Sequence, residues 1–173
     1  AGGAPQASAM AAVEAGGSRP IAPLLARINA IKRNRDIPAS IAALHQVGIP
    51  VAFNFTADID LGDFDRHMGY FSQGGLALPD PAFYTREDAD TRALLGRYTE
   101  YVEKILALTG TPADQLKDEM AMVLDLETRI ARASRPAEAL RDPAANYAPV
   151  PTAGLAKQFR NLQLAEFLQA QGV

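Results

Sequence analysis

The chain has 173 residues, the size of one domain or of one lobe of a larger one. Its formal net charge of −3 and isoelectric point near 5.4 argue against a nucleic-acid-binding surface, which is normally basic. The absence of cysteine excludes disulfides and thiolate metal sites.

No apolar run approaches the roughly 20 residues that cross a bilayer, so the sequence predicts no membrane segment in this chain. The chain begins with Ala1-Gly2-Gly3, without Met, and stops directly after a helical pattern. We therefore expect a portion of a longer polypeptide.

The first part of the chain is expected to be helical. Residues 1–18 are rich in Ala and Gly, and a short helix through Met10 and Val13 is one interpretation of them. Ser18 is predicted to cap a helix from Pro20 to Ile31. Asp36 is predicted to cap a helix over residues 38–47, which Gly48 ends.

A β-hairpin is expected next. Val51–Thr56 and His67–Gln73 are short, β-rich segments, and residues 58–66 are predicted to form a polar connection. Four alternately spaced carboxylates in that connection could suit calcium, but the spacing fails the EF-hand pattern, which needs Gly at position six and Glu at position twelve. A solvated loop is the preferred interpretation of Asp58, Asp60, Asp63 and Asp65.

The segment Gly75–Tyr84 is predicted to run from a strand into a helix. Leu76 and Leu78 alternate with Ala77, which suits a half-buried strand that Pro79 ends. Asp80 is a good N-cap residue, followed by Pro81 in the first helical position.

Long helices dominate the rest of the sequence. An apolar stripe predicts a helix over residues 86–108, with Gly110 after its end. Thr111 is expected to cap a second helix that reaches Ala133 and stops before Pro136. One turn is expected over residues 137–140 and a last pair of short helices from Thr152 onward. The predicted fold is mainly α, an antiparallel helical domain over residues 19–173 with one short β hairpin near residues 50–78.

The sequence offers no complete catalytic or metal-binding motif. Its two histidines, His45 and His67, are 22 residues apart and lack a partner at i+4, so neither forms the His-Glu-x-x-His pattern of a helical zinc site. No Gly-x-Ser-x-Gly elbow is present. Glu127 lies near an apolar stripe, and we expect it to pair with Arg132 or Arg135. We therefore predict no catalytic residue and no metal ligand in this chain.

Several motifs together resemble one family. Residues 75–84 resemble the Gly-Leu-x-Leu-Pro-x-x-x-Tyr-Tyr segment of the neprilysin and endothelin-converting-enzyme family of zinc metallopeptidases. Residues 123–131 resemble its Leu-x-Leu-Glu-x-x-Ile-Ala helix, and residues 141–147 its Asp-Pro-x-x-x-Tyr-Asn segment, although Ala148 replaces the final Asn. The matching positions, which the resemblance implies to be structural, are Leu78, Pro79, Tyr84, Glu127, Asp142, Pro143 and Tyr147.

The resemblance is to the N-terminal, mainly helical domain of that family, whose zinc and catalytic residues lie in a C-terminal domain. It implies a non-catalytic cap domain, meaning a domain that covers the catalytic one and encloses a chamber for peptides. The implied partners are the catalytic domain of the same polypeptide and peptide substrates, with zinc as the parent's cofactor and a periplasmic or extracellular location. A stand-alone helical protein-interaction module is the alternative.

Overall fold

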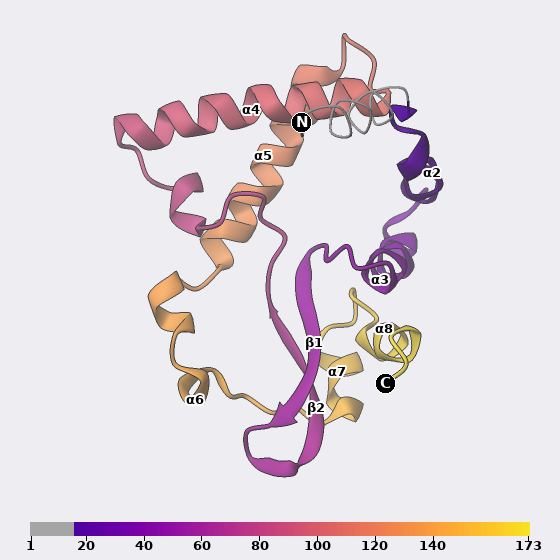
Figure 1. Cartoon of the computed structure of the whole chain (residues 1–173), viewed down its shortest axis with the longest axis vertical. Helices are drawn as coiled ribbons and strands as arrows, with labels where there is room; N and C mark the ends of the chain where they lie inside the picture. The colour runs from indigo at the N-terminus through magenta and orange to yellow at the C-terminus, as the bar shows by residue number, and fades with distance from the viewer. Residues whose placement is uncertain (1–15) are drawn as a thin grey trace, which may run out of the picture.

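The computed structural model describes residues 16–173 and shows a mainly helical chain with one two-stranded antiparallel sheet (Figure 1). The predicted fold class is therefore confirmed. The helix predicted through Met10 and Val13 lies outside the described residues. Among the helices of residues 16–173, none combines the length and the apolarity needed to cross a membrane.

The described elements are the following, in chain order within each class. The strands are β1 (Phe53–Asp60) and β2 (Asp63–Gln73). The α-helices are α2 (Ala22–Asn29), α3 (Ile37–Gln46), α4 (Ala89–Thr109), α5 (Leu116–Ala133), α6 (Pro143–Asn146), α7 (Thr152–Gln158) and α8 (Leu164–Ala170). Short 3-10 helices are η1 (Arg19–Ile21), η2 (Asn34–Asp36), η3 (Pro81–Tyr84) and η4 (Ala137–Leu140).

Two predicted N-cap residues stand at the N-cap positions, but neither makes a side-chain capping bond to the helix that follows. Ser18 precedes η1, but its side chain makes no capping hydrogen bond. Asp36 precedes α3, but its carboxylate accepts from the backbone N–H groups of Lys32 and Arg33, at 3.1 and 3.0 Å, on the other side. The start of α3 relies instead on Pro38, which suits the first turn of a helix.

The hairpin is longer than predicted. The strands are paired in one register as far as Ile59 and His67, Asp60 pairs with Asp63 after a shift in register, and only Leu61 and Gly62 separate β1 from β2. The expected polar connection over residues 58–66 is wrong because polar side chains on a two-stranded sheet can face water on one side while the backbone stays paired.

The strand predicted over Leu76–Leu78 does not form. Pairing of β2 ends at Gln73, which leaves no neighbouring strand for these residues. The predicted N-cap is confirmed, since Asp80 Oδ1 accepts from the backbone N–H of Ala82 at 2.8 Å.

The longest helices, α4 and α5, form a pair in which α5 runs back across α4 (Figure 1). Asp88 caps α4 through the N–H of Thr91 at 3.0 Å, and Gly110 ends it in the left-handed conformation. Helix α5 begins at Leu116, later than predicted, and the Thr111 hydroxyl bonds Glu119 at 2.9 Å instead of capping the helix.

The apolar side chains form two separate cores. In the first, which we call the helical unit (η3, α4 and α5), Tyr84, Tyr98 and Ala131 are buried. In the second, the hairpin unit (α3, β1, β2, α7 and α8), Leu155, Leu164 and Leu168 pack on the phenylalanines of the hairpin. The Phe167 ring lies at the centre of that unit, and its centroid is within 5.8 Å of those of His45, Phe53, Phe55 and Phe71.

Candidate functional site

The first polar cluster centres on Glu127 inside the helical unit. Its Oε2 atom accepts hydrogen bonds from the hydroxyls of Tyr98 at 2.7 Å and of Tyr84 at 3.1 Å. The Tyr84 hydroxyl also accepts from the backbone N–H of Leu78 at 2.9 Å. One carboxylate thus joins α5, α4 and η3, and the Tyr84 hydroxyl adds the segment before η3.

Burial makes both tyrosines harder to ionise. It is the largest cause that raises the pKa of Tyr98 and of Tyr84 above their usual value, and the nearby Glu127 carboxylate raises both further. Neutral hydroxyls remain donors to the carboxylate. The predicted pairing of Glu127 with Arg132 or Arg135 is wrong, because the tyrosines supply its partners and the Arg135 guanidinium bonds Asn146.

The second polar cluster centres on Asp60 at the end of β1. Asp60 has 0% of its surface exposed, although the sequence suggested a solvated loop residue. Its Oδ1 accepts from the Tyr147 hydroxyl at 2.6 Å and from the N–H of Gly62 at 2.9 Å, and its Oδ2 accepts from Arg66 at 2.7 Å. The hairpin turn is thereby attached to the segment before α7.

These donors stabilise the charged form of Asp60. The Tyr147 hydroxyl, the Arg66 guanidinium and the Gly62 N–H together lower the pKa of Asp60 from 3.8 to about 2. A Cβ at Gly62 would lie 2.6 Å from the Tyr147 hydroxyl oxygen, so a larger residue there would displace the Tyr147 side chain from Asp60. A carboxylate with so low a pKa and three donors is a poor general base near neutral pH.

The predicted motif positions divide between the two clusters. Leu78, Tyr84 and Glu127 meet in the first cluster. The carboxylate of Asp142 caps α6 through the N–H groups of Ala144 and Ala145, and Pro143 and Tyr147 follow it toward the second cluster. Pro79 is exposed between Leu78 and the Asp80 cap and lies in neither cluster.

Sequence reasoning missed Tyr98 and Asp60 as members of these clusters. Tyr98 belongs to the apolar pattern that predicts the helix over residues 86–108, and this pattern gives no sign of its hydroxyl bond. Asp60 stands two residues before Gly62, and an Asp at that spacing commonly bonds the backbone of a tight turn, which was the available signal.

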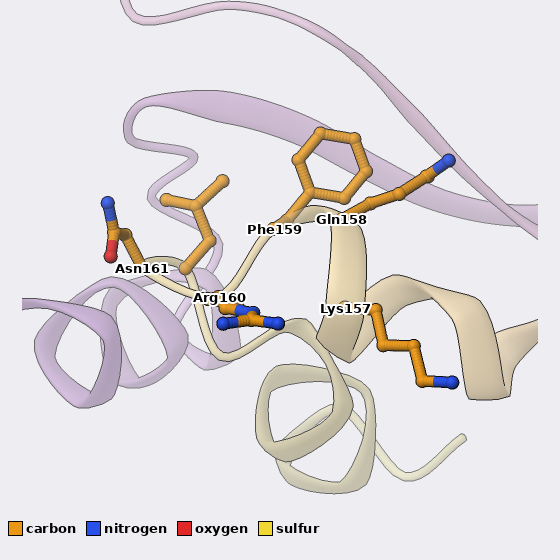
Figure 2. A pocket seen from close by; sticks show the side chains of 6 residues that line it. Lys157, Gln158, Phe159, Arg160 and Asn161 are labelled. Atoms are coloured by element: carbon orange, nitrogen blue, oxygen red, sulfur yellow. The ribbon is translucent and has the colours of Figure 1, made fainter.

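The described residues do not form a catalytic constellation. Across residues 16–173, no group of three or more His, Cys, Asp or Glu side chains could hold a metal ion. One hollow of about 380 Å³ is lined by residues 157–162, where Figure 2 shows the Phe159 ring pointing away from the cationic ends of Lys157 and Arg160. The charged and aromatic groups of this hollow therefore do not converge on a common point.

Apolar side chains are exposed in rows on both units. On α4, Tyr101, Ile105 and Leu108 are spaced i, i+4 and i+7 and are 59%, 40% and 72% exposed. On α5, Met122 and Leu126 are exposed one turn apart. The hairpin turn exposes further apolar residues, namely Ile59, Leu61 and Phe64.

Known proteins with similar sequences include relatives of neprilysin and of endothelin-converting enzyme. The chain is 30% identical to neprilysin-3 of Drosophila melanogaster over 105 residues, which are 61% of the chain and 13% of that protein. It is 29% identical to an endothelin-converting enzyme homolog of Locusta migratoria over 138 residues, which are 75% of the chain and 19% of that protein. The chain thus spans less than a quarter of the length of either relative.

A solved structure shares the fold. The Mycobacterium tuberculosis zinc metalloprotease Zmp1, solved with an inhibitor, superimposes with a TM-score of 0.78 at 25% identity over 89% of the chain and 24% of that protein. The sequence profile for the N-terminal region of peptidase family M13 matches residues 6–173. The motifs, the fold and this match over nearly the whole chain show that the protein belongs to peptidase family M13.

Proposed function

We propose that this chain is part of the non-catalytic cap domain of a zinc metalloendopeptidase that hydrolyses peptides. The observation that carries the proposal is the superposition of 89% of the chain on only 24% of a zinc metalloprotease. A chain that matches so small a part of its relative corresponds to one structural portion of the enzyme. The proposed domain comprises residues 19–173.

The remainder of the polypeptide would supply the zinc site. When bound, zinc in such an enzyme polarises a water molecule for attack on a peptide carbonyl. The described residues do not fit that ion, since neither carboxylate cluster has the several converging ligands that zinc needs. Their proposed task is to build a wall of the peptide chamber and to restrict access by size.

The exposed apolar rows support a docking role. Tyr101, Ile105 and Leu108 leave one stripe of α4 in water, and rows of this kind commonly mark contact surfaces. The acidic hairpin turn exposes Phe64 in the same way. We propose that the catalytic domain of the same polypeptide covers at least one of these surfaces.

We propose that the residues at the family-motif positions stabilise the fold and take no part in catalysis. Glu127 and Tyr84 hold the helical unit together, and Tyr147 anchors the hairpin turn through Asp60. We also propose a periplasmic or extracellular location, which rests on the relatives named neprilysin and endothelin-converting enzyme.

Size selection gives a direct test. The full polypeptide is incubated with an unstructured peptide and with the same sequence placed in a surface loop of a stable folded protein. A cap that encloses a chamber predicts cleavage of the free peptide and resistance of the folded host. Equal cleavage of both substrates would contradict the enclosing role, and absence of any peptide cleavage would favour a helical interaction module.

A further inference from the structure

The two units share no core. The buried residues of the helical unit and those of the hairpin unit form separate clusters. Among the described elements, α4 packs on α5 and η3, whereas α8 packs on α3 and α7. Figure 1 shows α4 and α5 at one end and the hairpin with α7 and α8 at the other, joined by irregular segments.

Two of those segments meet at the base of the hairpin. Gln73 is the last residue of β2, and Arg135 lies just after α5. The Gln73 side-chain amide both donates a hydrogen bond to the Arg135 backbone and accepts one from it. Gln73 Nε2 donates to the Arg135 carbonyl at 3.0 Å, and Gln73 Oε1 accepts from the Arg135 N–H at 2.9 Å. Both bonds are exposed, so water can replace them.

The backbone beside the two Gln73–Arg135 hydrogen bonds is irregular. Gly75 has a φ of +80°, and Ala52, opposite it, has a φ of +67°. A Cβ at Gly75 would lie 3.0 Å from the Ala52 carbonyl oxygen, so the chain leaves the hairpin through a position that requires glycine. Short irregular segments between packed units are where proteins absorb changes in φ and ψ.

We propose that this junction, formed by residues 73–75 and 134–136, is a hinge between the helical unit and the hairpin unit. The Gln73–Arg135 hydrogen bonds hold the two units in one relative orientation. When water replaces these bonds, the units can adopt other relative orientations while each core remains packed. The hinge does not depend on the peptidase role proposed above, because it rests only on the separation of the cores and on the contacts at the junction.

Spin-label distances in the full polypeptide test the hinge. This chain has no cysteine, so K104C on α4 and T56C on β1 place one exposed label in each unit. Two pairs within units, K104C with R132C and T56C with E166C, report whether each unit stays intact. Pulsed electron–electron double resonance measures the distance distribution of each pair. Any native cysteines in the polypeptide outside this chain are first replaced.

The decisive variant is Q73A, and Q171A is its matched control. Gln171 also uses its side-chain amide on a backbone carbonyl, that of Ala42 at 3.1 Å, but within the hairpin unit. The hinge predicts that Q73A broadens or shifts the distribution between units, that Q171A leaves that distribution unchanged, and that the pairs within units keep their widths. An unchanged distribution between units in Q73A would overturn the proposal.

Discussion

The hydroxyl of Tyr98 on α4 donates a 2.7 Å hydrogen bond to Glu127 on α5, in the core where Tyr84 and Ala131 are also buried. The tyrosine is 8% exposed, so little water can reach the bond. Removing a carboxylate from water costs free energy unless hydrogen-bond donors surround it. The polar pair therefore specifies how the two longest helices meet.

Removal of this donor should destabilise the helical unit. Y98F keeps the ring but removes one hydroxyl donor from the partly buried Glu127 carboxylate, and the loss of such a hydrogen bond to a charged group costs about 1–3 kcal/mol. Urea unfolding followed by circular dichroism measures the change. Y101F is the control on the same helix, since Tyr101 is exposed, and its free energy of unfolding should stay at the native value. Equal effects of the two variants would show that Glu127 does not depend on Tyr98.

Replacement of Asp60 should weaken the hairpin turn in a pH-dependent way. In the folded chain the pKa of Asp60 is about 2, below its ordinary value of 3.8, so the unfolded chain takes up this proton at higher pH. The stabilisation is therefore fully present above the unfolded pKa and is lost as the pH falls toward the folded pKa. Thermal unfolding of native protein and D60N at several pH values measures it.

The melting temperature of D60N should lie below that of the native protein at neutral pH, and the gap should close between about pH 4 and pH 2. D65N serves as the control because Asp65 is exposed on the same hairpin, and it should show no such gap. A gap for D60N that stays constant down to pH 2 would contradict the low pKa of Asp60.

Glycine substitutions should act in opposite directions at two positions. G75A should destabilise by at least about 1 kcal/mol, because the residue has a positive φ and its Cβ would crowd Ala52. G96A, inside α4 with open space around the new Cβ, should stabilise by about 0.5–1 kcal/mol through the better helix propensity of alanine. Chemical unfolding of both variants provides the measurement, and a destabilised G96A or a neutral G75A would contradict the structure.

The sequence predicted the kinds of elements better than their polar contacts. The end of α4 at Gly110 and the N-cap at Asp80 were predictable because each depends on neighbouring residues in the chain. The strand expected over Leu76–Leu78 failed because a strand also needs a partner, which local alternation cannot reveal.

The polar clusters were harder to predict from the sequence, because their members are far apart along the chain. Glu127 bonds Tyr84 and Tyr98, which are 43 and 29 positions away, so nearby arginines were the only partners visible in the sequence. Asp60 and Tyr147 are 87 positions apart. The family motifs identified Tyr84, Glu127 and Tyr147 as structural candidates, but their partners required the fold.

The most direct test of the proposed role is to measure bound zinc and peptide hydrolysis in parallel on the full polypeptide and on residues 1–173 alone, with circular dichroism to check that each is folded. A cap domain predicts stoichiometric zinc and chelator-sensitive peptide cleavage in the full polypeptide, and neither in the shorter chain. Zinc-dependent hydrolysis by residues 1–173 alone, or a full polypeptide without bound zinc, would contradict that role.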